Sequence, residues 1–322
     1  MNPSANCPKA EPSATRAPGA TDATGCEADR PPRASASVLL LRDGSAGLEV
    51  LLLRRHPGTE VLGGVYVFPG GKLDAADCDA AWLAALDQPE ADFAHQLNEP
   101  QTSGEQARGL HLAALRELYE EAGVLLAAPA GGGAWPSGLG PSPAFSQGLL
   151  QALQQGRPWP EVLGLHGVQA RTAALRPWSR WITPRNPVVG TARFDTRFFL
   201  ALLPPGQQAV PDQREAVEAL WLSPRAALQR HWAQELELIA PQLMALAELA
   251  RFESAASAWQ QALGRRAPCI EPMPFAEGAL RGLCYPGDPC HAQPERLLPG
   301  PTRLRVVGRR FEPVGGFEGW FA

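Results

Sequence analysis

The chain has 322 residues, of which 45% are hydrophobic and 19% charged, a composition typical of a globular protein with a substantial core. The 29 lysines and arginines against 33 aspartates and glutamates give a formal net charge of −4, which excludes a basic footprint for nucleic acid over the whole chain but not local basic patches. From this charge we expect no nucleic-acid partner. No apolar run approaches the roughly 18 residues that a membrane-spanning helix needs, so we expect no membrane partner either.

The N-terminal segment, residues 1–33, is rich in Ala, Pro, Ser, Thr and Gly and has no apolar periodicity. Such a segment buries too little apolar surface to offset the entropy of ordering, so we expect a disordered tail. The segment has no apolar run behind a positive start, and the six cysteines of the chain are scattered without a Cys-x-x-Cys pair. These features predict a protein of the reducing cytoplasm.

Three short strands follow the tail. Ser37–Leu41 and Leu48–Leu53 are apolar runs on either side of a turn cluster, and they predict a hairpin. Val65–Phe68 predicts a third strand, which ends at Pro69-Gly70-Gly71, where the backbone must turn sharply.

The middle of the chain favours helices. Residues 78–98 predict a helix in two pieces, broken at Pro89. A strong helix is predicted from Glu105 to Ala122, where Leu112 and Leu115 recur on the apolar side and Gly123 ends the helix. The remaining predictions are helices over 144–156, 239–252 and 254–263, a helix that starts at 223–224, and strands over 193–203, 216–222, 282–285 and 302–307.

Three glutamates near the end of the strong helix suggest chemistry. Glu117, Glu120 and Glu121 fall at positions i, i+3 and i+4, so their carboxylates share one helix face. Like charges in that arrangement repel, whereas a hard divalent cation takes such a cluster of oxygen ligands. A solvated acidic helix face is the alternative interpretation.

Together with Phe68-Pro-Gly-Gly-Lys72, this helix resembles the Nudix box, G-x5-E-x7-R-E-U-x-E-E-x-G-U, in which U is aliphatic. Gly71 matches the opening glycine, while Asp77 stands where the box has its first glutamate. Asp77 and Arg116 are separated by 38 residues instead of seven, so the box carries an insertion of 31 residues. The second half matches at every specified position, namely Arg116, Glu117, Leu118, Glu120, Glu121, Gly123 and Val124.

An inserted box is a feature of the Nudix subgroup that includes the mammalian peroxisomal coenzyme A diphosphatase. The segments Asp74–Asp77, Trp181–Pro184 and Arg193–Thr196 also resemble that subgroup. The resemblance implies an α/β fold, the Nudix α/β/α sandwich with a mixed sheet and a helical insertion inside the box, at about 78–108. It places the hydrolase domain at 34–235, and residues 236–322 form a C-terminal extension of helices and strands packed on it.

The resemblance also implies a small-molecule, nucleoside-diphosphate-linked substrate that water cleaves at a phosphoanhydride bond with the help of Mg²⁺ or Mn²⁺. The first-choice substrate is coenzyme A or an acyl derivative, which would give phosphopantetheine and 3′,5′-ADP. Other substrates remain open, namely ADP-ribose, dinucleotides and oxidised nucleotides. A Nudix-fold nucleotide-binding regulator without catalysis is a further alternative, although such a protein has no need of three crowded carboxylates.

The resemblance assigns roles to the residues of the box. Glu120 and Glu121 are the expected main metal ligands, and Glu117 is a further ligand or the residue that orients or deprotonates the attacking water. The carbonyl of Gly71 is an additional expected ligand, because no side chain blocks the approach. Arg116 is expected to brace the carboxylates through a forked ion pair.

Residues outside the helix complete the set of candidates. Glu215 or Glu218 is expected to supply one more carboxylate to the metal, and an ordinary charge at a strand edge is the alternative for each. Lys72 lies beside the glycine turn, where it is a candidate for contact with a substrate phosphate.

Charged residues alternate along the predicted strand over 193–203. Arg193, Asp195 and Arg197 therefore point to one face of that strand. We expect Arg193 and Arg197 to hold substrate phosphates on this face. A ladder of ion pairs among the three residues explains the same pattern equally well.

Overall fold

The computed structural model describes residues 31–59, 62–133, 135, 140–185, 187, 192–278 and 280–322. Most of the predicted N-terminal tail, residues 1–30, lies outside the described residues. Arg33, which the sequence assigned to the tail, already belongs to the first strand. No helix in the described ranges is long and apolar enough to cross a membrane.

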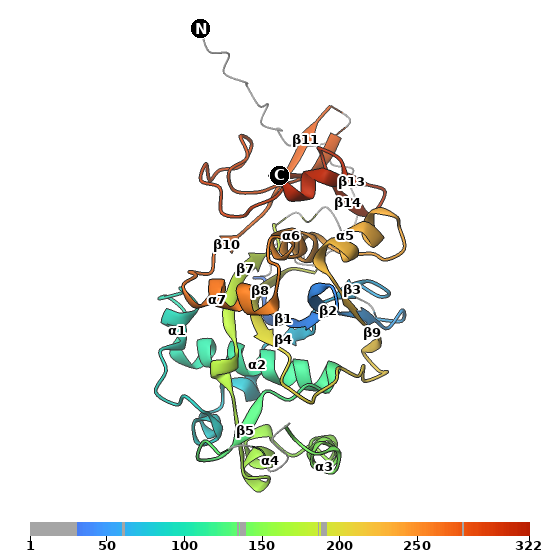
Figure 1. The fold of residues 1–322 in the computed structure, drawn as a ribbon. Helices are drawn as coiled ribbons and strands as arrows, with labels where there is room; N and C mark the ends of the chain where they lie inside the picture. The colour runs from blue at the N-terminus through green and yellow to red at the C-terminus, as the bar shows by residue number, and fades with distance from the viewer. Residues whose placement is uncertain are drawn as a thin grey trace, which may run out of the picture.

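A mixed β-sheet forms the centre of the fold (Figure 1). Its strands are β1 Arg33–Gly44, β2 Gly47–Arg55, β3 Tyr66–Val67, β4 Gly70–Lys72, β7 Arg176–Ile182, β8 Phe194–Leu202, β9 Ala216–Leu222 and β10 Cys269–Ile270. The order is β10-β7-β8-β1-β2-β3, while β4 pairs with β1 and β9 pairs with β2. The β1–β8 and β10–β7 pairs are parallel and the others antiparallel, as expected for a mixed sheet.

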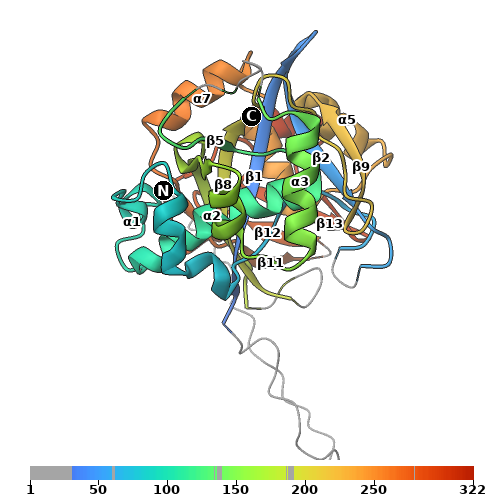
Figure 2. The same cartoon turned by 90° about the horizontal axis from the view of Figure 1, so that it is seen from below.

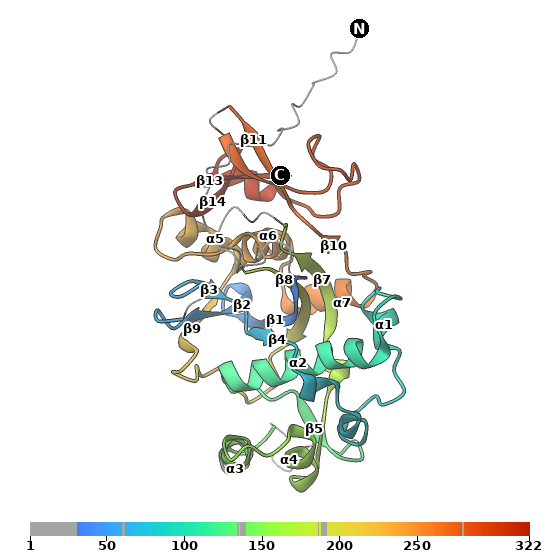
Figure 3. The same ribbon diagram turned by 180° about the vertical axis from the view of Figure 1, so that it is seen from behind.

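Helices cover both faces of this sheet (Figures 1 and 3). Helix α2, Gly104–Ala122, lies across one face, and α5 Pro224–Trp232, α6 Ala240–Leu249 and α7 Ala255–Leu263 lie on the other. Strand β1 supplies both cores, because Val38 and Leu40 face the α2 side while Leu39 and Leu41 face the opposite cluster. The α/β sandwich and the helices predicted over 105–122, 239–252 and 254–263 are confirmed.

The insertion inside the box is less helical than predicted. Instead of a helix in two pieces over 78–98, the chain forms three short turns, η2 Ala75–Cys78, η3 Ala80–Ala85 and α1 Phe93–Gln96. Asp79 and Asp92 accept backbone N–H bonds at the starts of η3 and α1, so each aspartate begins a new turn where a longer helix would have to continue. Helix α2 begins at Gly104 behind the N-cap Ser103, so the last residues of the 31-residue insertion already belong to this helix, and the bounds of about 78–108 stay a prediction.

A two-stranded ribbon and two helices follow the box. Strands β5 Ala127–Pro129 and β6 Val168–Ala170 pair with each other. Between them lie α3 Pro143–Gln154 and α4 Trp159–Leu165, on the side of α2 that faces away from the sheet (Figures 1 and 2). The hydroxyl of Tyr119 in α2 donates to the carbonyl of Ser146, 2.9 Å away, which fastens α3 to α2.

The C-terminal residues add a second, antiparallel sheet beyond α5 and α6 (Figure 1). Its strands are β11 Met273–Glu277, β12 Leu280–Cys284, β13 Arg303–Val307 and β14 Arg310–Pro313, and the short turn η5 Phe317–Phe321 follows. Buried Tyr285 and Trp320 share one hydrophobic cluster with Leu39 of the main sheet. That cluster includes residues from both sides of position 235. The domain division at 235/236 stays a prediction.

Candidate active site

Helix α2 presents the acidic cluster at its C-terminal end. Ser103 caps the start of the helix by accepting the N–H of Gln106, and Gly123 ends it with a left-handed φ of 68°. Strand β4 lies beside the last turns, and a Cβ at Gly71 would collide with the carboxylate of Glu117. A side chain at position 71 would therefore displace the Glu117 carboxylate, and Gly70 is required beside it, because its φ is 157° and a Cβ there would collide with the backbone of β1.

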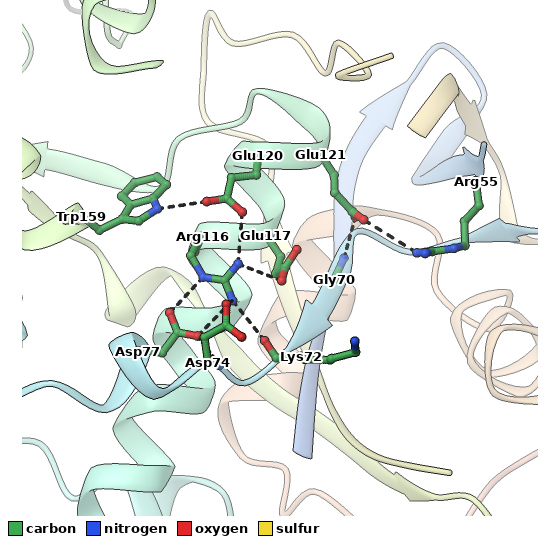
Figure 4. A network of polar contacts seen from close by, with 10 residues as sticks. All are labelled: Arg55, Gly70, Lys72, Asp74, Asp77, Arg116, Glu117, Glu120, Glu121 and Trp159. Atoms are coloured by element: carbon green, nitrogen blue, oxygen red, sulfur yellow. Dashed lines mark hydrogen bonds and ion pairs between the residues drawn. The ribbon is translucent and has the colours of Figure 1, made fainter. Parts of the chain in front are cut away.

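Arg116 joins the two halves of the box (Figure 4). Its Nε and Nη2 each donate to one oxygen of Asp77 at 3.0 Å, so the pair is bidentate. Nη1 donates to Glu117 at 2.8 Å and to Glu120 at 3.1 Å, and Nη2 also donates to the carbonyl of Lys72. The expected bracing role of Arg116 thus has a direct geometric basis.

The same contacts explain why the box tolerates aspartate at position 77. The Asp77 side chain is buried, and its Oδ2 also accepts the N–H of Asp74, which closes the η2 turn. Both of its oxygens are therefore directed to Arg116 and η2. Asp77 aligns Arg116 across the insertion and does not face the glutamates.

Glu121 is buried, and the Glu117 side chain is largely covered, with 13% of it exposed. Glu121 is 4% exposed, accepts the N–H of Gly70 at 2.9 Å and lies 3.9 Å from Nη1 of Arg55. Burial raises the pKa of Glu121 to about 8 and that of Glu117 to about 7. The charge of Glu215 is a smaller cause that raises both pKa values in the same direction. Buried, mutually repelling carboxylates favour a bound cation.

Glu120 is the exposed member of the three, with 42% of its side chain accessible. Its two oxygens have different donors, because Arg116 contacts Oε2 while the indole N–H of Trp159 donates to Oε1 at 3.1 Å. Sequence patterns carry no signal for Trp159, because a tryptophan there resembles an ordinary core residue. Sequence patterns also give no signal for Arg55, because it follows an apolar predicted strand and belongs to no motif.

The two candidate carboxylates outside the box have different surroundings. Glu218 accepts the hydroxyl of Tyr66 at 2.8 Å and pairs with Arg54 at 3.6 Å, so its carboxylate already has partners on β3 and β2. Glu215 is exposed and acts electrostatically on Glu117 and Glu121. The choice of Glu215 as the further carboxylate for a cation stays a prediction.

We expect Glu215→Gln to lower kcat about tenfold at limiting metal concentration, because one anionic oxygen ligand is lost. Glu218→Gln is the matched control, and its kcat is expected to stay within about twofold of the wild type. The exposed ion pair that it loses contributes little to the stability of the fold. Steady-state kinetics over a metal titration checks both variants. Equal effects of the two substitutions would contradict the assignment.

The expected phosphate contact of Arg197 is wrong. Its side chain is 4% exposed, and it pairs with Glu99 at 2.9 Å and with Asp195 at 2.9 Å. Arg180 pairs with the same two carboxylates at 3.1 and 2.7 Å. The alternating charges of β8 therefore include a buried ion-pair network, and a guanidinium held inside it has no access to a substrate.

The other two cations predicted for phosphate lie nearer to solvent. The Arg193 guanidinium donates to the carbonyls of Thr183 and Pro184 near the start of β8. The Lys72 side chain is exposed and follows directly after Gly71, beside the acidic cluster (Figure 4). Lys72 is therefore the predicted phosphate contact that the fold brings to the glutamates.

The donor set fits a hard divalent cation in its chemistry. Among the residues that the structure describes, no three Asp, Glu, His or Cys side chains converge at metal-holding distances. Arg116 holds Glu117 and Glu120, while Gly70 holds Glu121. Three carboxylates on one helix face nevertheless supply the anionic oxygens that Mg²⁺ and Mn²⁺ take. Coordination requires these side chains to turn toward a common point.

Comparison with known proteins places the chain in a family. Residues 19–251 match the model of the NUDT19 Nudix domain. The acyl-coenzyme A diphosphatase NUDT19 of Gallus gallus is 32% identical over 244 residues, which are 66% of this chain and 63% of the chicken protein. The human protein of the same name is 29% identical over 282 residues, 78% of this chain and 74% of its own length. This chain thus spans less than two thirds of the chicken relative.

A solved structure has the same fold. The crystal structure of a NUDIX hydrolase from Alicyclobacillus acidocaldarius superposes with a TM-score of 0.54 at 26% identity. The match covers 71% of this chain and 96% of the bacterial protein. Hydrolases of this fold generally use divalent metal ions. The chain belongs to the Nudix hydrolases, within the family defined by the NUDT19 Nudix domain.

Proposed function

We propose that this protein hydrolyses the diphosphate linkage of coenzyme A or acyl-coenzyme A with Mg²⁺ or Mn²⁺, releasing phosphopantetheine and 3′,5′-ADP. The single observation that carries the proposal is the assembled split box, in which Arg116 joins Asp77 to Glu117 and Glu120 across the insertion. The substrate class rests on similarity to relatives whose name is acyl-coenzyme A diphosphatase.

The reaction requires water to attack a phosphorus atom surrounded by negative oxygens. When bound, a divalent cation neutralises those oxygens and lowers the pKa of the attacking water. Glu120, Glu121 and the Gly71 carbonyl are the groups proposed to hold the cation, with Glu215 as a further ligand. Glu117 is proposed to orient and deprotonate the water, because Arg116 holds its carboxylate beside Glu120 in the last turns of α2.

Positively charged side chains are proposed to orient the substrate by contacting its phosphates. Lys72 is proposed to contact a phosphate of the diphosphate, because its ammonium group extends from β4 next to the cluster. Phosphate contact by Arg193 and location in the cytoplasm both stay predictions.

A substrate panel tests the proposal. With coenzyme A, acetyl-coenzyme A, NADH, ADP-ribose and 8-oxo-dGTP, we expect the coenzyme A compounds to give the highest kcat/KM, with 3′,5′-ADP identified by mass spectrometry. EDTA is expected to abolish turnover, and Mg²⁺ or Mn²⁺ to restore it. A higher kcat/KM for ADP-ribose or NADH would keep the Nudix chemistry and overturn the substrate. Cleavage of no compound with either metal would favour a nucleotide-binding regulator.

A further inference from the structure

A tryptophan from outside the box contacts one of its glutamates. Trp159 is the first residue of α4, and its Nε1 donates to Oε1 of Glu120 across 39 positions of sequence. Figure 4 shows the indole on one side of the Glu120 carboxylate and Arg116 on the other. Both oxygens of this exposed side chain are therefore fixed by donors from two different segments.

The indole is itself held in place. It stacks on Trp82 of the insertion, with ring centroids 6.4 Å apart and 23° between the planes. The ring of Tyr119 meets it edge-to-face at 5.5 Å, and Tyr119 is fastened in turn to α3. The direction of the Trp159 N–H bond is thus set by packing between the insertion, α2 and α4.

The two donors to Glu120 differ in charge, and the difference matters for a cation. A guanidinium stabilises the carboxylate but repels a nearby metal ion, whereas an indole N–H orients the carboxylate without adding positive charge. Each carboxylate oxygen has two lone pairs, so Oε1 can accept the indole proton and still ligate a metal.

We propose that Trp159 is a positioning residue for the metal ligand Glu120, an inference that rests on the metal-dependent function proposed above. The hydrogen bond restricts the rotamers of an exposed glutamate and leaves a lone pair on Oε1 for a metal, so that Glu117 and Glu121 are the side chains that turn toward it. The segment that carries α3 and α4 thereby becomes part of the metal site, although it lies outside the box.

The test is Mn²⁺ affinity, measured by electron paramagnetic resonance on the full chain without substrate. Trp159→Phe keeps an aromatic ring between Trp82 and Tyr119 but removes the donor. We expect its Kd for Mn²⁺ to rise about tenfold. Trp232→Phe is the matched control, because that indole packs on Phe317 of η5, and its Kd is expected to match the wild type.

A double-mutant cycle separates positioning from packing. In a Glu120→Gln background, Trp159→Phe is expected to leave the Kd unchanged within about twofold, because the carboxylate it orients is absent. Tenfold weaker binding in both backgrounds would show that the indole acts through packing and would overturn the inference. Wild-type affinity in Trp159→Phe would overturn it as well. A wild-type chain that binds no Mn²⁺ would overturn the proposed function and this inference together.

Discussion

Glu121→Gln is expected to lower kcat/KM at least about 100-fold while the protein stays folded, because an anionic ligand is lost from a site that must neutralise a diphosphate. The amide retains an oxygen that can accept the Gly70 N–H, so the local backbone is preserved. Initial rates with saturating metal, together with circular dichroism, measure the two effects.

The same substitution is expected to stabilise the metal-free protein at alkaline pH. The pKa of Glu121 rises from 4.5 to about 8 because the side chain is buried. Between these values the unfolded chain has lost a proton that the folded chain retains, so the free energy of unfolding falls as pH rises. Glutamine does not titrate, so the free energy of unfolding of the variant does not fall with pH for this reason. The melting temperature of Glu121→Gln should therefore exceed that of the wild type by more at pH 8 than at pH 5.

Added Mg²⁺ supplies the control for this pair of results. It is expected to raise the melting temperature of the wild type at pH 8, because a ligand that binds only the folded state stabilises it, and to raise that of the variant much less. Near-normal turnover in Glu121→Gln would contradict its role as a ligand, whatever the stability result.

Arg197→Met is expected to have the largest effect on stability, at about 3 kcal/mol in the free energy of unfolding. The substitution keeps much of the side-chain volume but leaves buried Glu99 and partly exposed Asp195 with one arginine, Arg180, between them. Urea denaturation measures the loss. Because Arg197 has no access to the substrate, KM is expected to stay within about twofold of the wild type.

The double variant Glu99→Gln/Arg197→Met provides the control. Removing a carboxylate along with its arginine relieves the unpaired charge, so the double variant is expected to lose less stability than the sum of the single variants. A large rise in KM for Arg197→Met with unchanged stability would restore the phosphate-binding role that the structure excludes.

The sequence predicted most of what is local. The period of the α2 residues, the glycine at its end and the three glutamates on one face are enough to predict the helix and its acidic end. The match to the second half of the box identified Arg116 as the bracing residue, and Figure 4 shows that contact. These features depend on residues that are neighbours in the chain.

Contacts between distant segments were not predictable in the same way. The pattern of β8 allowed both a phosphate site and an ion-pair ladder, and only the position of Glu99 against Arg197 decides between them. Asp77 departs from the motif, and its bidentate pair with Arg116 explains the departure. Trp159 reaches Glu120 only because α4 folds back over α2, which no periodicity reports.

The central claim is that water, assisted by a divalent metal, cleaves a coenzyme A diphosphate at this cluster. Hydrolysis of coenzyme A in ¹⁸O-labelled water, with mass spectrometry of both products, tests it most directly. We predict one ¹⁸O atom in the new terminal phosphate of a single product, dependent on Mg²⁺ or Mn²⁺ and absent with Glu121→Gln. Products that carry no label, or that form equally in EDTA, would contradict the account.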